Sequence, residues 1–341
     1  MHPDGNGRPT APASPPTMPQ RVVLDPELAA TLQLAGPLTL KRAWPRQTEH
    51  AALEYVDGRG RLAPGQWFAE PAACRAAARA IRREAGAQGT VAVVGDGRLL
   101  LQLGGADRKL PGLAPLLARP GATLLVHRPE RRAVVRLEET TVTRYAKVVP
   151  PGRAAALAAQ LTALQTVAGN RLRIPTLHAV DAALGVVTMS ALPGKPLYAL
   201  LDHPALPAYL AAAGQALRTL HATTPPAGTG THDAAAEVEV LTHWLARAQE
   251  VAPAQVPALV SQARPIAAAL AAGGSNAVLL HRDFYDKQII VDGDGSVGLL
   301  DFDTLATGEA ALDVANALVH LELRAWQRAW PFAGPSRKRP S

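Results

Sequence analysis

The chain has 341 residues, of which 48% are hydrophobic, and its formal net charge is +7. That length can bury one large core or two ordinary ones, and a single cysteine, Cys74, excludes an intrachain disulfide. No apolar run approaches the roughly 20 residues of a membrane span. The first twenty residues lack the apolar core of a secretory signal, so we expect a cytoplasmic protein with no membrane partner.

The positive charge is unevenly distributed along the chain. Residues 190–330 hold 8 Lys and Arg against 14 Asp and Glu, a net charge of −6, which leaves +13 elsewhere. A basic protein can bind nucleic acid, but the acidic part of this chain carries its chemical motifs, so we expect no nucleic-acid partner. An acidic lobe instead favours a cationic small-molecule acceptor, through Coulomb attraction.

The N-terminal third of the chain predicts a small α/β region. Residues 1–22 are rich in Pro, Gly and Ser and predict a disordered tail. Residues 36–71 predict short strands broken by turns at "DGRG" and "APG", and residues 72–86 predict an Ala-rich helix that stops at a glycine. "TVAVV" and "RLLLQL" flank "GDG" and predict a hairpin. Residues 23–121 thus form an N-terminal extension of unknown role.

The remainder divides into a sheet region and a helical region. Residues 122–192 predict an antiparallel sheet with one inserted helix at 153–169. Residues 193–330 predict helices over 204–225, 234–252, 256–274 and 310–330, because apolar residues recur there at helical spacing. A basic tail follows at 331–341.

The segment "LLHRDFYDKQIIVDGDGSVGLLDFD", residues 279–303, gathers aspartates. Asp283 follows a His-Arg pair, and Gln288 stands five residues later. "IIVDGDGSVGLLD" predicts two strands joined by a tight turn, which lead to Asp301 and should bring all three side chains together. Phosphoryl transfer from ATP needs one carboxylate to orient the attacking hydroxyl, and oxygen ligands to hold Mg²⁺.

"HRDFYDKQ" followed by "LLDFD" resembles the catalytic loop and the metal-binding Asp-Phe motif of the protein-kinase-like fold. "LLDFDTLATGEAALDVAN", "GQALRTLHA" and "MSALPGKPL" are similar to its aminoglycoside phosphotransferase and choline kinase branch, over about residues 122–326. The resemblance implies an α+β two-lobe fold with an antiparallel-sheet N-lobe and a mainly helical C-lobe. It also implies an ATP- and Mg²⁺-dependent kinase that phosphorylates the hydroxyl of a small molecule: an aminoglycoside, an amino alcohol or a sugar-like compound.

Position in these motifs implies the roles of five residues. Asp283 is the catalytic base or orienter and His281 braces its loop, while Asp301 and Gln288 are the Mg²⁺ ligands. Gln288 replaces the family's Asn, so it offers the same oxygen on a side chain one methylene longer. Asp313 gives structural support, capping the next helix and tying it to the catalytic loop; a plain N-cap is the alternative.

The residues expected to bind the nucleotide depart further from the family pattern. Lys147, in "TRYAKVV", should contact the phosphates, unless it is a solvated edge lysine. The family pairs this lysine with a helix glutamate, but residues 148–180 contain no acid, which leaves Gln160 or Gln165 as hydrogen-bonding substitutes. "RPERR" replaces the Gly-rich loop. Its arginines either bind phosphate or lie on a solvated turn; they are Arg128, Arg131 and Arg132.

Two other functions compete with the small-molecule kinase. The missing helix glutamate favours a nucleotide-binding pseudokinase with a regulatory role. A protein kinase is disfavoured, because the 13 residues from Asp301 to Asp313 leave no room for a long activation loop. The sequence does not identify the acceptor or the oligomeric state.

Overall fold

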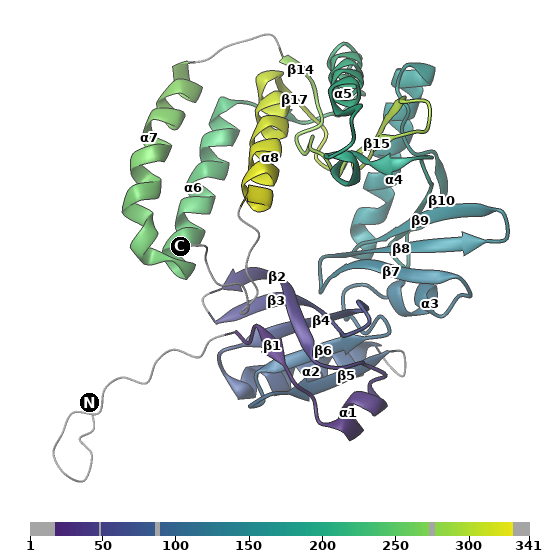
Figure 1. The fold of residues 1–341 in the computed structure, drawn as a ribbon, viewed down its shortest axis with the longest axis vertical. Helices are drawn as coiled ribbons and strands as arrows, with labels where there is room; N and C mark the ends of the chain where they lie inside the picture. The colour runs from purple at the N-terminus through teal and green to yellow at the C-terminus, as the bar shows by residue number, and fades with distance from the viewer. Residues whose placement is uncertain (1–17, 48, 86–88, 273–276, 330–341) are drawn as a thin grey trace. The chain divides into compact units, whose positions relative to one another are not determined.

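The structure is a computed structural model that describes residues 18–47, 49–85, 89–272 and 277–329 (Figure 1). Its contacts divide the chain into two compact units. The first comprises Met1–Thr140, Ala146–Pro151 and Ala183–Val186, and the second comprises Thr141–Tyr145, Gly152–Ala182 and Val187–Ser341. The basic tail at 331–341 lies outside the described residues, and the predicted domain boundaries stay predictions.

Six strands form the sheet of the first unit, in the order β1-β2-β3-β4-β6-β5. They are β1 (Arg21–Val22), β2 (Leu38–Gln47), β3 (His50–Val56), β4 (Leu62–Phe68), β5 (Thr90–Val94) and β6 (Leu99–Leu103). The hairpin of β5 and β6 is confirmed as antiparallel. The predicted helix is α2 (Pro71–Ala85), which packs on β4, β5 and β6 and buries Cys74 and Ile81 against Phe68 and Leu100. A short helix, α1 (Pro26–Thr31), follows β1.

The structure differs from the sequence expectations at two places in this sheet. The predicted "APG" turn is wrong, because Ala63, Pro64 and Gly65 lie inside β4 and pair with β3. Pairing of β4 with β6 begins only at Gly65. Pro64 therefore has only β3 as a partner strand, and its missing N–H breaks no hydrogen bond to β6. The predicted tail ends earlier than residue 22, because β1 pairs with β2 and the Val22 side chain is buried.

The second sheet has the order β10-β11-β9-β8-β7. Its strands are β7 (Ala122–Arg128), β8 (Arg132–Glu139), β9 (Val142–Val148), β10 (Leu177–Asp181) and β11 (Val186–Ser190), with helix α4 (Pro151–Ala168) and a 3₁₀ turn (Gly169–Arg171) between β9 and β10. The prediction of one sheet with an inserted helix is confirmed. Within the first unit, α3 (Leu113–Leu117) packs on β7 and β8 and buries Leu113 beside Val135.

The rest of the second unit is mainly helical. Its helices are α5 (Leu206–His221), α6 (Ala234–Val251), α7 (Val256–Ala272) and α8 (Ala311–Ala329), with 3₁₀ turns at Leu197–Leu200 and Pro253–Gln255. Figure 1 shows α6 and α7 side by side. Two small sheets complete the unit: β12 (Lys195–Pro196), β15 (Ile289–Val291) and β16 (Val297–Leu299), and β13 (Thr231–His232), β17 (Ala306–Glu309) and β14 (Ala277–Leu280). Leu217 and Leu220 of α5 are buried in one core with Phe284 and Leu299.

This architecture confirms the predicted α+β class, in which antiparallel sheets precede a helical region. Antiparallel pairing follows from the short turns between successive strands. Across the described residues, no helix has both the length and the apolarity that a membrane crossing requires.

Candidate active site

The predicted hairpin of β15 and β16 is present and antiparallel, and it joins the two aspartate segments. The side-chain amide nitrogen of Gln288 donates to Oδ2 of Asp283 over 3.1 Å. The carbonyl oxygen of Gln288 accepts a 2.9 Å hydrogen bond from the backbone N–H of Leu300, the residue before Asp301. The ends of the hairpin therefore lie together, and Gln288 links the Asp283 loop to the segment that follows β16 and carries Asp301.

His281 makes a second link between the same two segments. Its side chain is fully buried, and its Nε2 donates a 2.8 Å hydrogen bond to the carbonyl oxygen of Leu300. Burial lowers the pKa of His281, and it outweighs the opposing charges of Asp313, Asp283 and Asp301. The result is a neutral imidazole that holds the loop against the strand.

Asp313 connects α8 to the catalytic loop. Its buried carboxylate accepts hydrogen bonds from the backbone N–H groups of His281 (2.8 Å) and Arg282 (2.6 Å) and from Nε2 of His221 (3.0 Å). It stands third in α8, inside the first turn. Asp313 is therefore not an N-cap, since an N-cap residue precedes the first turn. The capping part of the predicted role and the plain N-cap alternative are both wrong, while its hydrogen bonds agree with the predicted link to the catalytic loop.

Backbone strain is concentrated near this site. Among the described residues, four non-glycine residues have a positive φ, and two of them are Arg282 (65°) and Asp301 (59°). Such a conformation costs about 1–3 kcal/mol and persists only where the surroundings enforce it. Asp313 bonds the backbone N–H of Arg282, and His281 bonds the carbonyl next to Asp301. Asp313 of α8 thus holds the backbone at Arg282, and His281 holds the backbone next to Asp301.

Helix α4 carries the two glutamines that the sequence offered as partners of the lysine. Nε2 of Gln160 donates to the carbonyl oxygen of Phe302 over 2.6 Å, and Nε2 of Gln165 donates to that of Pro175 over 2.7 Å. Gln160 therefore contacts the Asp-Phe motif directly. Lys147 lies on β9 in the first unit and is only 7% exposed, so the solvated edge lysine is wrong.

The β7–β8 turn is only partly the solvated turn that the sequence offered as an alternative. Arg131 and Arg132 are exposed, but Pro129 and Glu130 are buried. Arg128 is half-buried, with its guanidinium 5.4 Å from the centre of the Trp44 ring. Sequence reasoning missed the buried acids here, because nothing local to "RPER" signals that Glu130 points inward.

The acidic surplus of residues 190–330 is largely committed to contacts within the protein. The following acids accept hydrogen bonds or form ion pairs: Asp202, Asp233, Glu237, Glu250, Asp286, Asp292, Asp294 and Asp313. These contacts fix the positions of the acids but leave the net charge of −6 for residues 190–330 unchanged.

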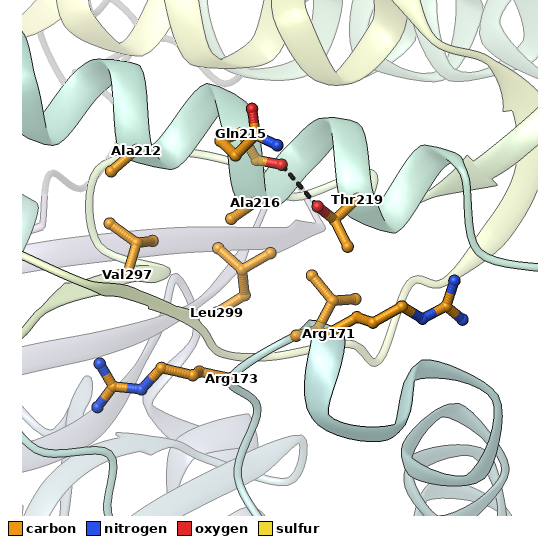
Figure 2. A pocket seen from close by; sticks show the side chains of 9 residues that line it. Arg171, Arg173, Ala212, Gln215, Ala216, Thr219, Val297 and Leu299 are labelled. Carbon is orange, nitrogen blue, oxygen red and sulfur yellow. Dashed lines mark hydrogen bonds between the residues drawn. The ribbon is translucent and has the colours of Figure 1, made fainter.

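A pocket of about 280 Å³ lies beside β16 in the second unit (Figure 2). Its lining comprises Arg171, Leu172, Arg173, Ala212, Gln215, Ala216, Thr219, Val297 and Leu299. Figure 2 shows the two arginine side chains extending away from each other, while the hydroxyl of Thr219 donates to the Gln215 carbonyl over 2.9 Å. The predicted site residues do not line it.

Comparison with solved structures finds several phosphotransferases. Aminoglycoside phosphotransferase APH(3'')-Id from Streptomyces rimosus shares 22% identity at a TM-score of 0.47, covering 62% of this chain and 82% of that one. An aminoglycoside-3'-phosphotransferase of type VIII shares 19% identity at a TM-score of 0.43, and the match covers 64% of this chain and 90% of that one. A choline/ethanolamine kinase family protein from Mesorhizobium loti shares 20% identity at a TM-score of 0.41, and the match covers 65% of this chain and 74% of that one.

A search of curated proteins finds no match. The family model of the phosphotransferase enzyme family, APH, matches residues 121–335. This match includes the catalytic-loop motif, the Asp-Phe motif and the helix that carries Asp313, and it is the basis of the assignment. The chain therefore belongs to the phosphotransferase enzyme family.

Proposed function

We propose that this enzyme transfers the γ-phosphoryl group of ATP to a small-molecule hydroxyl, with Mg²⁺ bound by Asp301 and Gln288. The contact between Gln288 and Asp283 carries the proposal, because it sets a carboxylate beside an amide at the end of the hairpin. The amide nitrogen donates to Asp283, so we assign the amide oxygen to the cation. Carboxylate and amide oxygens are hard ligands that suit Mg²⁺.

Asp283 then orients the acceptor hydroxyl and receives its proton. Mg²⁺, when bound, neutralises charge on the phosphates. On the nucleotide side we assign phosphate contacts to Lys147, Arg128, Arg131 and Arg132. His281 and Asp313 act indirectly, since their hydrogen bonds hold the backbone on either side of the reacting groups.

Mg²⁺-dependent ATP consumption with a panel of aminoglycosides, amino alcohols and sugars tests this function. We expect turnover with at least one acceptor, and phosphorylated product by mass spectrometry. Asp301→Asn should lose Mg-ATP binding, because it removes the main metal charge. Asp283→Asn should bind nucleotide but turn over ~100-fold more slowly or worse. Asp294→Asn, an exposed acid in the same hairpin turn, is the matched control and should behave as wild type.

A nucleotide-binding pseudokinase is the second candidate. It is favoured by α4, which has no acid to neutralise a phosphate-binding lysine and whose Gln160 is bonded to Phe302. The same assay separates the two functions. Binding of Mg-ATP with no turnover on any acceptor supports the pseudokinase, and equal nucleotide affinity in wild type and Asp301→Asn contradicts both.

A further inference from the structure

The β7–β8 turn has a backbone that its sequence does not favour. The N–H of Arg131 donates to the carbonyl of Arg128 over 3.0 Å, with Pro129 second and Glu130 third in the turn. Glu130 has φ 60°, which matches a type II turn, where the third position normally takes Gly or Asn. A residue with a long charged side chain occupies that position here, so other contacts must hold it.

Those contacts come from four residues that we call the turn clamp: Arg46, Asp107, Arg108 and Lys109. The Glu130 carboxylate receives hydrogen bonds from Nε (2.7 Å) and Nη2 (3.0 Å) of Arg108, and Nζ of Lys109 lies 3.4 Å away. Arg46 lies 3.7 Å from the same carboxylate and also donates to the carbonyl oxygen of Pro129. The bidentate arginine contact fixes orientation as well as distance.

Asp107 fixes the backbone of the turn, whereas the three basic clamp residues fix the side chain of Glu130. Its carboxylate accepts from the N–H of Glu130 (2.7 Å), the N–H of Lys109 (2.8 Å) and Nε2 of His127 (2.9 Å). Asp107 and His127 are both buried. Three donors fix the position of this carboxylate, so the turn is held by backbone and side chain together.

The charges of the turn and clamp do not balance. Burial opposes ionisation of Glu130, but Arg108, Lys109 and Arg46 outweigh it and lower its pKa. Burial also lowers the pKa of Arg128, helped by the charges of Arg132, Arg46 and Arg131. The group holds six basic side chains (Arg46, Arg108, Lys109, Arg128, Arg131, Arg132) against two acids (Asp107, Glu130). A net charge of +4 on a rigid turn is complementary to a polyphosphate.

We infer that Glu130 is a positioning residue for the nucleotide: held by the turn clamp, it keeps the β7–β8 turn in the conformation that presents its arginines to the phosphates. The inference rests on the proposed function. Every clamp residue precedes residue 121, where the family match begins. The N-terminal segment therefore takes part in nucleotide binding.

Two single variants of the full-length enzyme test this role. Glu130→Gly suits the positive φ but removes the clamped carboxylate, and Arg108→Gln removes the bidentate donor. We expect each to raise the Kd for ATP about tenfold, as for loss of one charge-assisted hydrogen bond, with the acceptor KM unchanged. The double variant should bind ATP no worse than Glu130→Gly alone, because removal of the Glu130 carboxylate already breaks the contact with Arg108. Arg108→Lys should recover part of the affinity.

Two controls separate positioning from general stability. Gln33→Gly relieves the same backbone strain (φ 54°) outside the clamp and should leave ATP affinity unchanged. Slow thiol labelling of Cys74 reports that the first unit is folded, and the isosteric Glu130→Gln replaces Glu130→Gly if the latter unfolds. Amide hydrogen exchange at Glu130 and Arg131, measured without nucleotide, should quicken in Arg108→Gln.

The outcomes distinguish this inference from the proposed function. If wild type binds ATP and the folded clamp variants bind it within twofold, the positioning role is wrong and the proposed function stands. Unchanged amide exchange in Arg108→Gln also overturns the role, because the clamp then does not hold the turn. If wild type itself binds no ATP, the proposed function fails and the inference fails with it.

Discussion

The side-chain amide of Gln288 donates a 3.1 Å hydrogen bond to the carboxylate of Asp283. This relationship makes the longer amide compatible with a site whose family counterpart is Asn. The nitrogen orients the carboxylate, and in the proposed function the oxygen is the metal ligand.

Substitution of Gln288 tests its place on the metal. Gln288→Asn keeps an amide oxygen and should retain substantial activity, within about tenfold of wild type. Gln288→Leu keeps the bulk but offers no ligand, and it should lose ~100-fold or more. Steady-state kinetics at several Mg²⁺ concentrations measure both effects. Equal activity of the Leu and Gln enzymes would show that this side chain is not a ligand.

Gln160 should be a positioning residue for the Asp-Phe motif. Its amide donates to the carbonyl of Phe302, and a carboxylate cannot make that bond. Gln160→Glu, which restores the acid typical of the family, should therefore raise the KM for Mg-ATP about tenfold. Gln165→Glu loses a similar bond to Pro175 and should affect only stability. A gain of turnover in Gln160→Glu would mean that the lysine partner matters more than the carbonyl bond.

Asp313 should be a strong determinant of stability. Asp313→Ala leaves three donors without their acceptor, and each buried donor costs about 1–3 kcal/mol. We expect urea unfolding to show a loss of about 3 kcal/mol or more. Asp233→Ala, which removes the exposed N-cap of α6, should cost about 1 kcal/mol. Similar losses in the two variants would argue against a buried bracing role.

Cys74 should be unreactive in the native enzyme. It is buried on α2, and burial raises the pKa of its thiol to about 11. Because the thiolate is the reactive form, labelling by a disulfide reagent at pH 8 should be at least ~100-fold slower in the native protein than in urea. As the chain has one cysteine, the signal has a single source. Comparable rates in both states would show that the α2 face opens readily.

Much of the candidate site could be predicted because its signals are local. The spacing from Asp283 to Gln288 and the "DGDG" turn before Asp301 lie within one hairpin, and turn chemistry determines how such a segment folds. The turn predicted at "APG" was wrong because its signal is local while its structure depends on distant strands. Pro64 is a turn residue by local preference, but the limited pairing of its strand with β6 accommodates it inside β4.

Periodicity and motif spacing are properties of neighbouring residues, so the family resemblance, the α+β class, most helix and hairpin positions and the aspartates of residues 279–303 could be predicted from the sequence. Which polar groups meet across long separations depends instead on how the chain packs. Asp313 bonds the backbone of His281, 32 residues away, and Glu130 is clamped by Arg108, 22 residues away. The family resemblance implied the Asp313 contact, but no local pattern encodes either pair. They form because burial makes an unpaired charge or N–H costly, and which partners lie within reach depends on how the whole unit packs.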